Sequence, residues 1–278
     1  MNILSIGAHP DDIELGCGGT LIKAAREGHR VFMYVLTRGG ASGDPVERTH
    51  EMFASANFVG AEKLWVDNFE DTKITVTSKL INHLEYFIHK ANPDIILTHS
   101  AQDYHHDHRA IAEATLEASR FSQNVLAYEI PITKTFNPQV YYDISDVIDD
   151  KIELIKLFWS QRNKVFTRTN AVRGLAEYRT FQSRLNTELS AVESFEVAKM
   201  CLGKDFEPFK LPQQPLPESI ARSIDLSDLI EHTPGSSSKL VSKPATAAAA
   251  AAAGGSGGNG NGKMVESFDG LFANRLSE

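Results

Sequence analysis

Two clusters of histidine and acidic residues are the part of this sequence best suited to perform chemistry. The first cluster contains His9, Asp11 and Asp12. The second lies about a hundred residues further along and consists of Asp103, His105, Asp107 and His108. Each cluster follows a short apolar run typical of a buried strand, and open α/β sheets bind ligands at the carboxyl ends of their strands. We therefore expect the two clusters to meet at one sheet edge, where they can hold one metal ion.

The residue types in these clusters favour a zinc site. Imidazole nitrogen and carboxylate oxygen suit zinc, and a catalytic zinc typically keeps three protein ligands and one open position. His9 and Asp12 can supply two ligands, and one of His105 and His108 can supply the third while the other stands near the substrate. An aspartate beside the metal can remove a proton from water whose pKa the ion has lowered. A protonated His105, oriented by Asp107, can stabilise a tetrahedral oxygen, which predicts a hydrolase of amide-like bonds.

Composition favours a globular enzyme and limits the choice of ligands. With 278 residues, of which 42% are hydrophobic, the chain can bury one good-sized core. Its net charge of -8 and its lack of clustered Lys and Arg argue against nucleic acid as a partner. The two cysteines, Cys17 and Cys201, are too few for a disulfide framework or a thiolate zinc site. The start of the chain lacks the basic residues and the apolar length of a signal peptide, and no stretch is long enough to span a membrane, so we expect a cytoplasmic protein.

Short apolar strands alternate with amphipathic helices in the first part of the chain. We expect strands at residues 2–7, 31–37, 64–66 and 94–98, and helices at 20–27, 78–90 and about 107–120. Alternation of this kind is typical of right-handed βαβ units. The sequence therefore predicts an α/β fold, a Rossmann-like, mainly parallel sheet with helices on both faces.

The second part of the chain gives weaker signals. We expect strands at 125–129 and 139–142, a long helix at 147–164, and a weakly helical region at 171–199 packed outside the sheet. Residues 1–232 are predicted to form the folded domain. Residues 233–262 contain seven consecutive alanines and a Gly/Ser/Asn tract, which predicts a flexible linker. Apolar residues at helical spacing in 263–278 indicate a short tail that docks or tethers a partner or further domain, although a frayed tail explains them equally well.

The motifs themselves are Ala8-His9-Pro10-Asp11-Asp12, followed by Glu14 and Gly16, and His105-His106-Asp107-His108-Arg109-Ala110. Together they strongly resemble the paired motifs of the PIG-L (LmbE-like) zinc-dependent de-N-acetylases. Supporting matches occur at Arg48, Glu51, Pro93-Asp94, Asn137-Pro138, Asp143-Ile144-Ser145, Ser160-Gln161, Arg173-Gly174 and Glu193-Ser194-Phe195, so that the resemblance covers roughly residues 1–200. One departure is His106, which stands where many members have proline.

The resemblance implies a role for each matching residue. Zinc ligands are implied at His9, Asp12 and His108, a general base at Asp11, and an oxyanion-stabilising or acid role at His105. Sugar contacts are implied at Arg48 and, through a looser match, at Asp71. The implied reaction removes acetyl from an N-acetylglucosamine-type amino-sugar conjugate, giving acetate and a free amine. Histidine and aspartate ligands accept Fe²⁺ as well as Zn²⁺.

Several alternative interpretations remain open from the sequence. Gly16, Gly18 and Gly19 follow the first strand and could indicate a nucleotide-binding Rossmann module without hydrolase activity, but the third glycine of that fingerprint is missing, so tight helix packing is the better explanation. Asp107 can cap a helix, and Arg48 can pair with a glutamate on its own helix. The chain could also be a scaffold whose tail recruits a partner. Five further histidines are expected to be surface residues, namely His29, His50, His83, His89 and His99.

Overall fold

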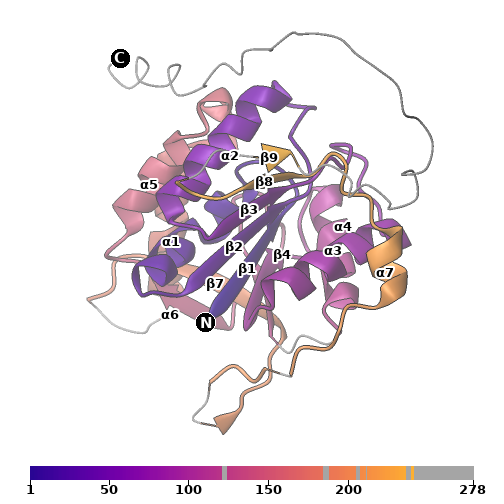
Figure 1. Ribbon diagram of the computed structural model, residues 1–278. Coiled ribbons are helices and arrows are strands. Elements are labelled where there is room, and N and C mark those ends of the chain that lie inside the picture. Colours follow the sequence, from indigo (N-terminus) through magenta and orange to yellow (C-terminus); the bar gives the residue numbers. More distant parts are fainter. Residues whose placement is uncertain (121–123, 184–187, 205–206, 211, 236–238, 241–278) are drawn as a thin grey trace, which may run out of the picture. The chain divides into compact units, whose positions relative to one another are not determined.

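Five parallel strands form the centre of a single sheet in the computed structural model, which describes residues 1–120, 124–183, 188–204, 207–210, 212–235 and 239–240 (Figure 1). These strands are β1 (Asn2–Gly7), β2 (Arg30–Val35), β3 (Lys63–Val66), β4 (Ile95–His99) and β5 (Val125–Tyr128). Their spatial order is β5-β4-β1-β2-β3, so the strand order reverses between β1 and β4. This is the strand order of the first five strands of a Rossmann sheet, and the predicted fold class is confirmed.

Antiparallel strands extend the sheet at both edges. β7 (Val192–Lys199) pairs with β5, and β6 (Val140–Asp143) pairs with β7. At the other edge, β8 (Ile230–His232) pairs with β3, and the short β9 (Lys239–Leu240) pairs with β8. The expectation of helix through residues 171–199 is therefore wrong for its second half. Its Glu and Arg content favoured a helix, but strand pairing on both sides overrides local propensity in β7.

Helices cover both faces of the sheet (Figure 1). One face carries α1 (Asp12–Arg26), α2 (Pro45–Val59), α5 (Ile148–Lys156) and α6 (Thr169–Ser183). The other carries α3 (Ser78–Ala91), α4 (His106–Ala118) and the short α7 (Glu218–Ser223). Two 3₁₀ turns, η1 (Trp159–Gln161) and η2 (Val165–Thr167), follow α5, so the long helix expected at 147–164 is wrong beyond Lys156. No helix in the described residues is long and apolar enough to cross a bilayer.

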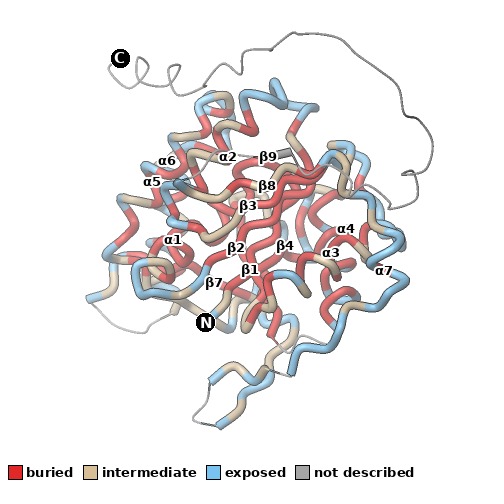
Figure 2. Tube along the Cα trace, in the orientation of Figure 1, coloured by how far each residue is buried: buried red, intermediate tan, exposed pale blue. Residues whose placement is uncertain are grey.

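An apolar core lies on each face of the sheet, and the central strands between the two cores are buried (Figure 2). One core joins α1, α2, α5 and α6 to the sheet, and the other joins α3 and α4 to it. Strands covered on both faces read as nearly continuous apolar runs, which explains why the first four were located well from the sequence.

Helix α1 begins at Asp12, eight residues before the helix start expected from the sequence, and is broken at Cys17, whose φ of -140° is not helical. Its glycines pack tightly. A Cβ atom at Gly16 would overlap the ring of Tyr128, and Gly18 and Gly19 lie equally close to aliphatic side chains of the second half of the chain. These contacts agree with tight helix packing as the role of the three glycines.

The predicted domain limits can be compared with the structure only in part. β8 ends at His232, where the predicted folded domain ends, and β9 adds two residues of the predicted linker to the sheet. Residues 241–278, with the rest of the linker and the whole predicted tail, lie outside the described residues.

Candidate active site

The two clusters meet at the carboxyl ends of β1 and β4, where the strand order reverses. The turn after β1 carries His9, Asp11 and Asp12, and the segment after β4 leads to the N-terminus of α4, which carries His108. This switch point is where doubly wound sheets form their ligand crevice. The expectation that remote clusters converge is confirmed.

Three side-chain donor atoms form a nearly equilateral triangle at this point. His9 Nδ1 lies 3.1 Å from His108 Nε2. Asp12 Oδ2 lies 3.2 Å from each of these two nitrogens. All three side chains are at least nine-tenths buried. In a tetrahedral zinc site with bonds near 2.0–2.2 Å, ligand atoms are about 3.3–3.5 Å apart, so the spacing of these atoms fits one bound cation.

The chemistry of the three donors agrees with that spacing. Two imidazole nitrogens that face each other cannot both carry a proton in the contact, so at least one lone pair points into the triangle. A carboxylate oxygen beside two such nitrogens completes a set of the kind that holds Zn²⁺ or Fe²⁺. The residues present therefore fit a divalent cation, although the triangle does not distinguish the metals.

The turn that carries Asp11 and Asp12 has a strained backbone. Asp11 is the N-cap of α1 and has a φ of 96°, a conformation that non-glycine residues rarely adopt. Asp12 Oδ2 accepts a hydrogen bond of 2.7 Å from the backbone N–H of His9, which closes the turn. Strain of this kind persists only where the surroundings enforce it, and here it directs Asp11 and Asp12 into one cavity.

Burial and neighbouring charges separate the two aspartates electrostatically. Burial, opposed by Arg48 and reinforced by Asp12, raises the pKa of Asp11 to about 8. Burial also disfavours the charged form of Asp12, but attraction to His108 and His99 outweighs it and holds the pKa of Asp12 well below its usual range. Asp12 is thus a permanent anion suited to ligation, whereas Asp11 can exchange a proton near neutral pH.

His9 is oriented from its other side by two carboxylates. Its Nε2 lies 3.0 Å from Asp71 and 3.1 Å from Asp107. Asp107 in turn accepts hydrogen bonds from the backbone N–H groups of Thr72 and Ile74, at 2.8 and 3.0 Å. A carboxylate on the far nitrogen of a ligating histidine fixes its ring and strengthens it as a ligand. Asp71, expected to contact a sugar, is therefore at the site, where it also holds His9.

The surroundings of His105 bear on its orientation and its protonation. Its Nδ1 accepts a hydrogen bond of 3.2 Å from the backbone N–H of Asp107, so it is that amide, and not the Asp107 carboxylate, that orients the ring. Burial, with His9 and His108 nearby, lowers the pKa of His105. The hydrogen bond to Nδ1 fits a neutral ring that carries its hydrogen on Nε2, whereas the protonated His105 expected from the sequence stays a prediction. His105, not Asp107, caps α4, so the alternative of Asp107 as a helix cap is wrong.

Arg48 is buried and binds the loops around Asp11. Its Nη2 donates to the Pro10 carbonyl at 2.6 Å and lies 3.4 Å from Asp11 Oδ2. Its Nη1 donates to the Gly39 carbonyl and to Ser42 Oγ. It does not act by pairing with Glu51, which accepts hydrogen bonds from Ser160 instead. Arg48 also lines the cavity beside the triangle, so it can contact a substrate as well.

Two histidines near the site, His99 and His106, make contacts that the sequence did not predict. His99 was expected at the surface but is buried at the end of β4, with its ring stacked on His108 at 3.9 Å. The Ala8 N–H donates to His99 Nε2 at 3.0 Å. His106 Nε2 lies 2.6 Å from the Thr72 carbonyl, so this residue ties the Asp71 loop to α4 and stays outside the triangle. The only sequence signal for His99 was its position as the last residue of an apolar strand.

A cavity of about 260 Å³ opens beside the triangle. Its polar wall includes Asp11, Arg48, Asp71 and His105, and its apolar wall includes Leu15 and residues 130–132. Loops that follow all five parallel strands contribute to it, so the cavity belongs to the carboxyl edge of the sheet. All eight site residues predicted from the sequence lie in this cavity or directly beside it.

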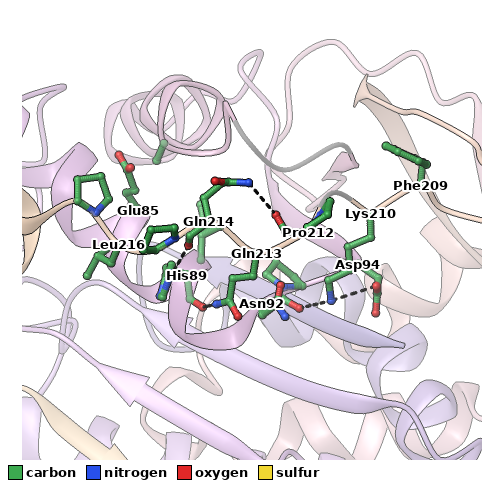
Figure 3. A pocket seen from close by; sticks show the side chains of 15 residues that line it. Glu85, His89, Asn92, Asp94, Phe209, Lys210, Pro212, Gln213, Gln214 and Leu216 are labelled. Carbon is green, nitrogen blue, oxygen red and sulfur yellow. Dashed lines mark hydrogen bonds and ion pairs between the residues drawn. The ribbon is translucent and has the colours of Figure 1, made fainter.

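A larger cavity, of about 480 Å³, lies elsewhere (Figure 3). It is enclosed by the ends of α3 and α4 and by a proline-rich strap at residues 212–217. Lys210 bridges Asn92 and Asp94 along its rim (Figure 3). None of the histidine and carboxylate clusters found among the described residues lines it, so size alone does not identify the active site.

The fold and the site together define a Rossmann-like protein whose histidine and aspartate cluster fits a divalent cation beside a cavity. The sequence profile of the PIG-L family, described as GlcNAc-PI de-N-acetylase, matches residues 4–119. The chain is also 35% identical over 153 residues to the uncharacterized deacetylase YaiS of Escherichia coli strain K12, a match that covers 52% of this chain and 82% of YaiS. The chain belongs to the PIG-L family, and it is a deacetylase.

Two further comparisons give a similar deacetylase sequence and a similar fold. Diacetylchitobiose deacetylase of Thermococcus kodakarensis is 28% identical over 185 residues, which is 57% of this chain and 69% of that protein. The crystal structure of the conserved protein TT1542 from Thermus thermophilus shares the fold, with a TM-score of 0.66 at 23% identity over 73% of this chain and 97% of that one.

Proposed function

We propose that this chain is a zinc-dependent deacetylase of an N-acetylated amino-sugar conjugate of the N-acetylglucosamine type. The observation that carries the proposal is the triangle of His9, Asp12 and His108 donor atoms beside the buried Asp11. The names of the matched family and of the diacetylchitobiose deacetylase support an N-acetylglucosamine unit as substrate. The ligand set fits Fe²⁺ as well, and zinc is the metal we propose.

His9, Asp12 and His108 would hold the cation through one carboxylate and two imidazoles. A divalent cation in such a site acts as a Lewis acid toward an amide carbonyl and lowers the pKa of water. Asp107 and Asp71 keep the His9 ring in place during the reaction. The His99 ring stacks on the His108 ring and so restrains the second imidazole.

Asp11 is the proposed general base. It takes a proton from the attacking water and can then deliver that proton to the departing amine, as a general base placed beside a reacting group commonly does. Water thus supplies the hydroxyl group of acetic acid. One proton of the water reaches the amine through Asp11, and the other is released when the acetic acid ionises to acetate. Arg48 keeps this carboxyl oriented by holding the Pro10 carbonyl and lying against Asp11 Oδ2.

His105 is the proposed oxyanion stabiliser. Because its Nδ1 accepts from the Asp107 amide, its Nε2 carries a hydrogen, and His105 lines the cavity. The N–H of a neutral imidazole can donate a hydrogen bond to the oxygen that becomes negative in the transition state, and this bond stabilises that oxygen. The apolar wall of Leu15 and Ile130 offers the acetyl methyl group a dry surface.

The test is amine release from a panel of N-acetylglucosamine conjugates, with metal analysis on the same samples. We expect wild type to lose activity in a chelator and regain it with Zn²⁺, His108→Ala to lose both metal and activity, and Asp11→Ala to lose activity. His29→Ala, at a histidine remote from the triangle, serves as the control. Full activity in metal-free protein would overturn the proposal. A cytoplasmic location stays a prediction, to be tested by cell fractionation.

A further inference from the structure

The break in α1 coincides with a buried ion pair supplied by two other elements. Lys151, from α5, and Glu193, from β7, are 2.5 Å apart, and their side chains are 4% and 3% exposed. Both elements lie against α1 (Figure 1). Burying two charges is costly unless further hydrogen bonds satisfy them, so the contacts that this pair makes need a physical reason.

Those contacts replace a step of the helix ladder. In a regular helix the Leu15 carbonyl accepts from the Gly19 N–H, four residues later. Here Lys151 Nζ donates to the Leu15 carbonyl at 2.8 Å, and the Gly19 N–H donates to Glu193 Oε1 at 2.9 Å. The Thr20 N–H donates to Glu193 Oε2 at 2.7 Å. The ion pair is thus inserted into the ladder at the non-helical Cys17, as side chains do at other helix kinks.

The charges have the sign that each half of the helix requires. An ammonium group stabilises the carbonyl end of a helical segment, and a carboxylate stabilises the N–H end. Lys151 therefore caps the C-terminal end of the first segment, which starts at Asp12. Glu193 caps the N-terminal end of the second segment. The pair thus supplies partners to the Leu15 carbonyl and to the Gly19 and Thr20 N–H groups where the helix bends.

The first segment is the one that bears the active site. Asp11 and Asp12 begin it, and Leu15, whose carbonyl Lys151 holds, lines the catalytic cavity. A Cβ atom on Gly16 would overlap the Tyr128 ring, so the segment has little room to shift toward the sheet. Lys151 and Glu193 hold its other end. The resemblance to the PIG-L family implied no role for Glu193, although this residue begins the matching Glu193-Ser194-Phe195 motif.

We propose that Lys151 and Glu193 are positioning residues that set the direction of the first segment of α1, and through it the placement of Asp11 and Asp12. This inference rests on the proposed metal site. Neither side chain is among the residues that line the catalytic cavity, so both act through the helix backbone. Disturbing the pair should weaken metal binding and catalysis while substrate binding changes less.

The variants to compare are Glu193→Gln, which removes the charge and puts an amide NH₂ beside N–H donors, and Lys151→Met, which leaves the Leu15 carbonyl unpaired. The matched control is Arg179→Met. Arg179 forms a similarly buried ion pair with Glu129, at 9% and 10% side-chain exposure, and makes no contact with α1 among its hydrogen bonds. Arg179 lines the same small cavity as Lys151 and Glu193, so removing it disrupts a neighbouring buried ion pair but deletes no hydrogen bond to α1.

The readouts are Zn²⁺ and Co²⁺ affinity, measured by competition with a chromophoric chelator, together with kcat and KM. All are measured well below the lowest melting temperature of the set. We expect each pair variant to lose at least about tenfold in metal affinity, the scale seen when supports of metal ligands are removed, with kcat falling more than KM rises. Arg179→Met should keep wild-type affinity and kcat.

Each outcome decides the matter. If wild type binds no metal, the proposed function fails. If wild type binds metal and the folded pair variants bind it equally well, the pair is only a stability element and this inference is wrong. Should both variants fail to fold, Glu193→Asp keeps the charge but shortens the reach to Gly19 and Thr20. It should then show the same selective loss of metal affinity and kcat, and wild-type values for it would refute the proposal.

Discussion

Replacing Asp11 by asparagine should stabilise the metal-free protein while nearly abolishing catalysis. Burial raises the pKa of this carboxyl in the folded protein to about 8 from an ordinary value of 3.8. The folded state therefore holds the proton more tightly than the unfolded chain. The resulting stability is complete below the unfolded pKa and is lost as the pH rises through the folded pKa.

The size of the effect follows from that shift. One pKa unit corresponds to about 1.36 kcal/mol, so ionising Asp11 between about pH 5 and about pH 8 costs on the order of 3–4 kcal/mol of stability. Asparagine has nearly the same shape, tolerates the positive φ of this position, and does not ionise. For a domain of this size, 3 kcal/mol corresponds to a melting temperature difference of roughly 6–12 °C.

The assay is thermal unfolding of chelator-treated wild type and Asp11→Asn across this pH range. The difference between the two proteins should be small at the acid end and should grow toward pH 8, with the variant more stable. Titration of neighbouring histidines is present in both proteins and cancels to first order. Glu113→Gln, at an exposed position of α4, should produce no such divergence.

Activity and metal content complete this test. With Zn²⁺ restored, the variant should keep its metal but lose about 10²–10⁴-fold in kcat, the usual contribution of a general base. A variant that is no more stable than wild type at any pH would show that burial does not raise the pKa of the Asp11 carboxyl in the folded protein. Loss of metal would show that Asp11, and not Asp12, is the ligand.

Three other substitutions have equally definite expected results. Arg48→Lys cannot bridge the Pro10 and Gly39 carbonyls together, so kcat should fall about 10–100-fold with metal retained; unchanged kinetics would mean that these loops hold Asp11 without it. Gly16→Ala should destabilise by about 1–3 kcal/mol in urea unfolding because its Cβ would overlap Tyr128, whereas Gly174→Ala, which meets nothing within 4 Å, should gain about 0.5–1 kcal/mol; equal effects would contradict the packing. Lys63, Lys90 and the Trp65 ring N–H outweigh burial and lower the pKa of Glu231 to about 2 from 4.5, so its stabilisation is present above pH 4.5 and is lost as the pH falls toward 2. Glu231→Gln should therefore cost about 1–3 kcal/mol at pH 7 and progressively less below about pH 4, and a cost that does not change with pH would refute this.

The parts of the fold and site that could be predicted are those encoded by short stretches of sequence. β1 and β4 are apolar runs bounded by polar residues, and the histidines and aspartates that follow them lie at recognisable spacings. Their convergence follows from the order of parallel strands, because carboxyl ends share one edge of a sheet. Residue types and strand order therefore predicted that His9 and Asp12 would meet a histidine of the second cluster, and the choice of His108 over His105 came only from the resemblance to the PIG-L family.

Other features depend on contacts that no local pattern encodes. β7 resembles a helix in composition and becomes a strand only because β5 and β6 flank it. His105 seemed suited to be a cation, but burial and two neighbouring histidines lower its pKa, and no local pattern encodes these surroundings. His99 gave no signal beyond its place at a strand end, and its role depends on the His108 ring that stacks on it from α4.

The position of Lys151 and Glu193 bears on where the functional unit ends. The region that matches the PIG-L profile stops at residue 119 and already contains every proposed ligand and the proposed base. Yet the helix segment that begins with Asp11 and Asp12 is held at its far end by side chains from α5 and β7. β7 extends the sheet, α5 packs on α1, and together they supply the side chains that bond to the α1 backbone around the break at Cys17. The second half of the domain is therefore part of the catalytic apparatus, because it fixes the direction in which the first half presents its aspartates.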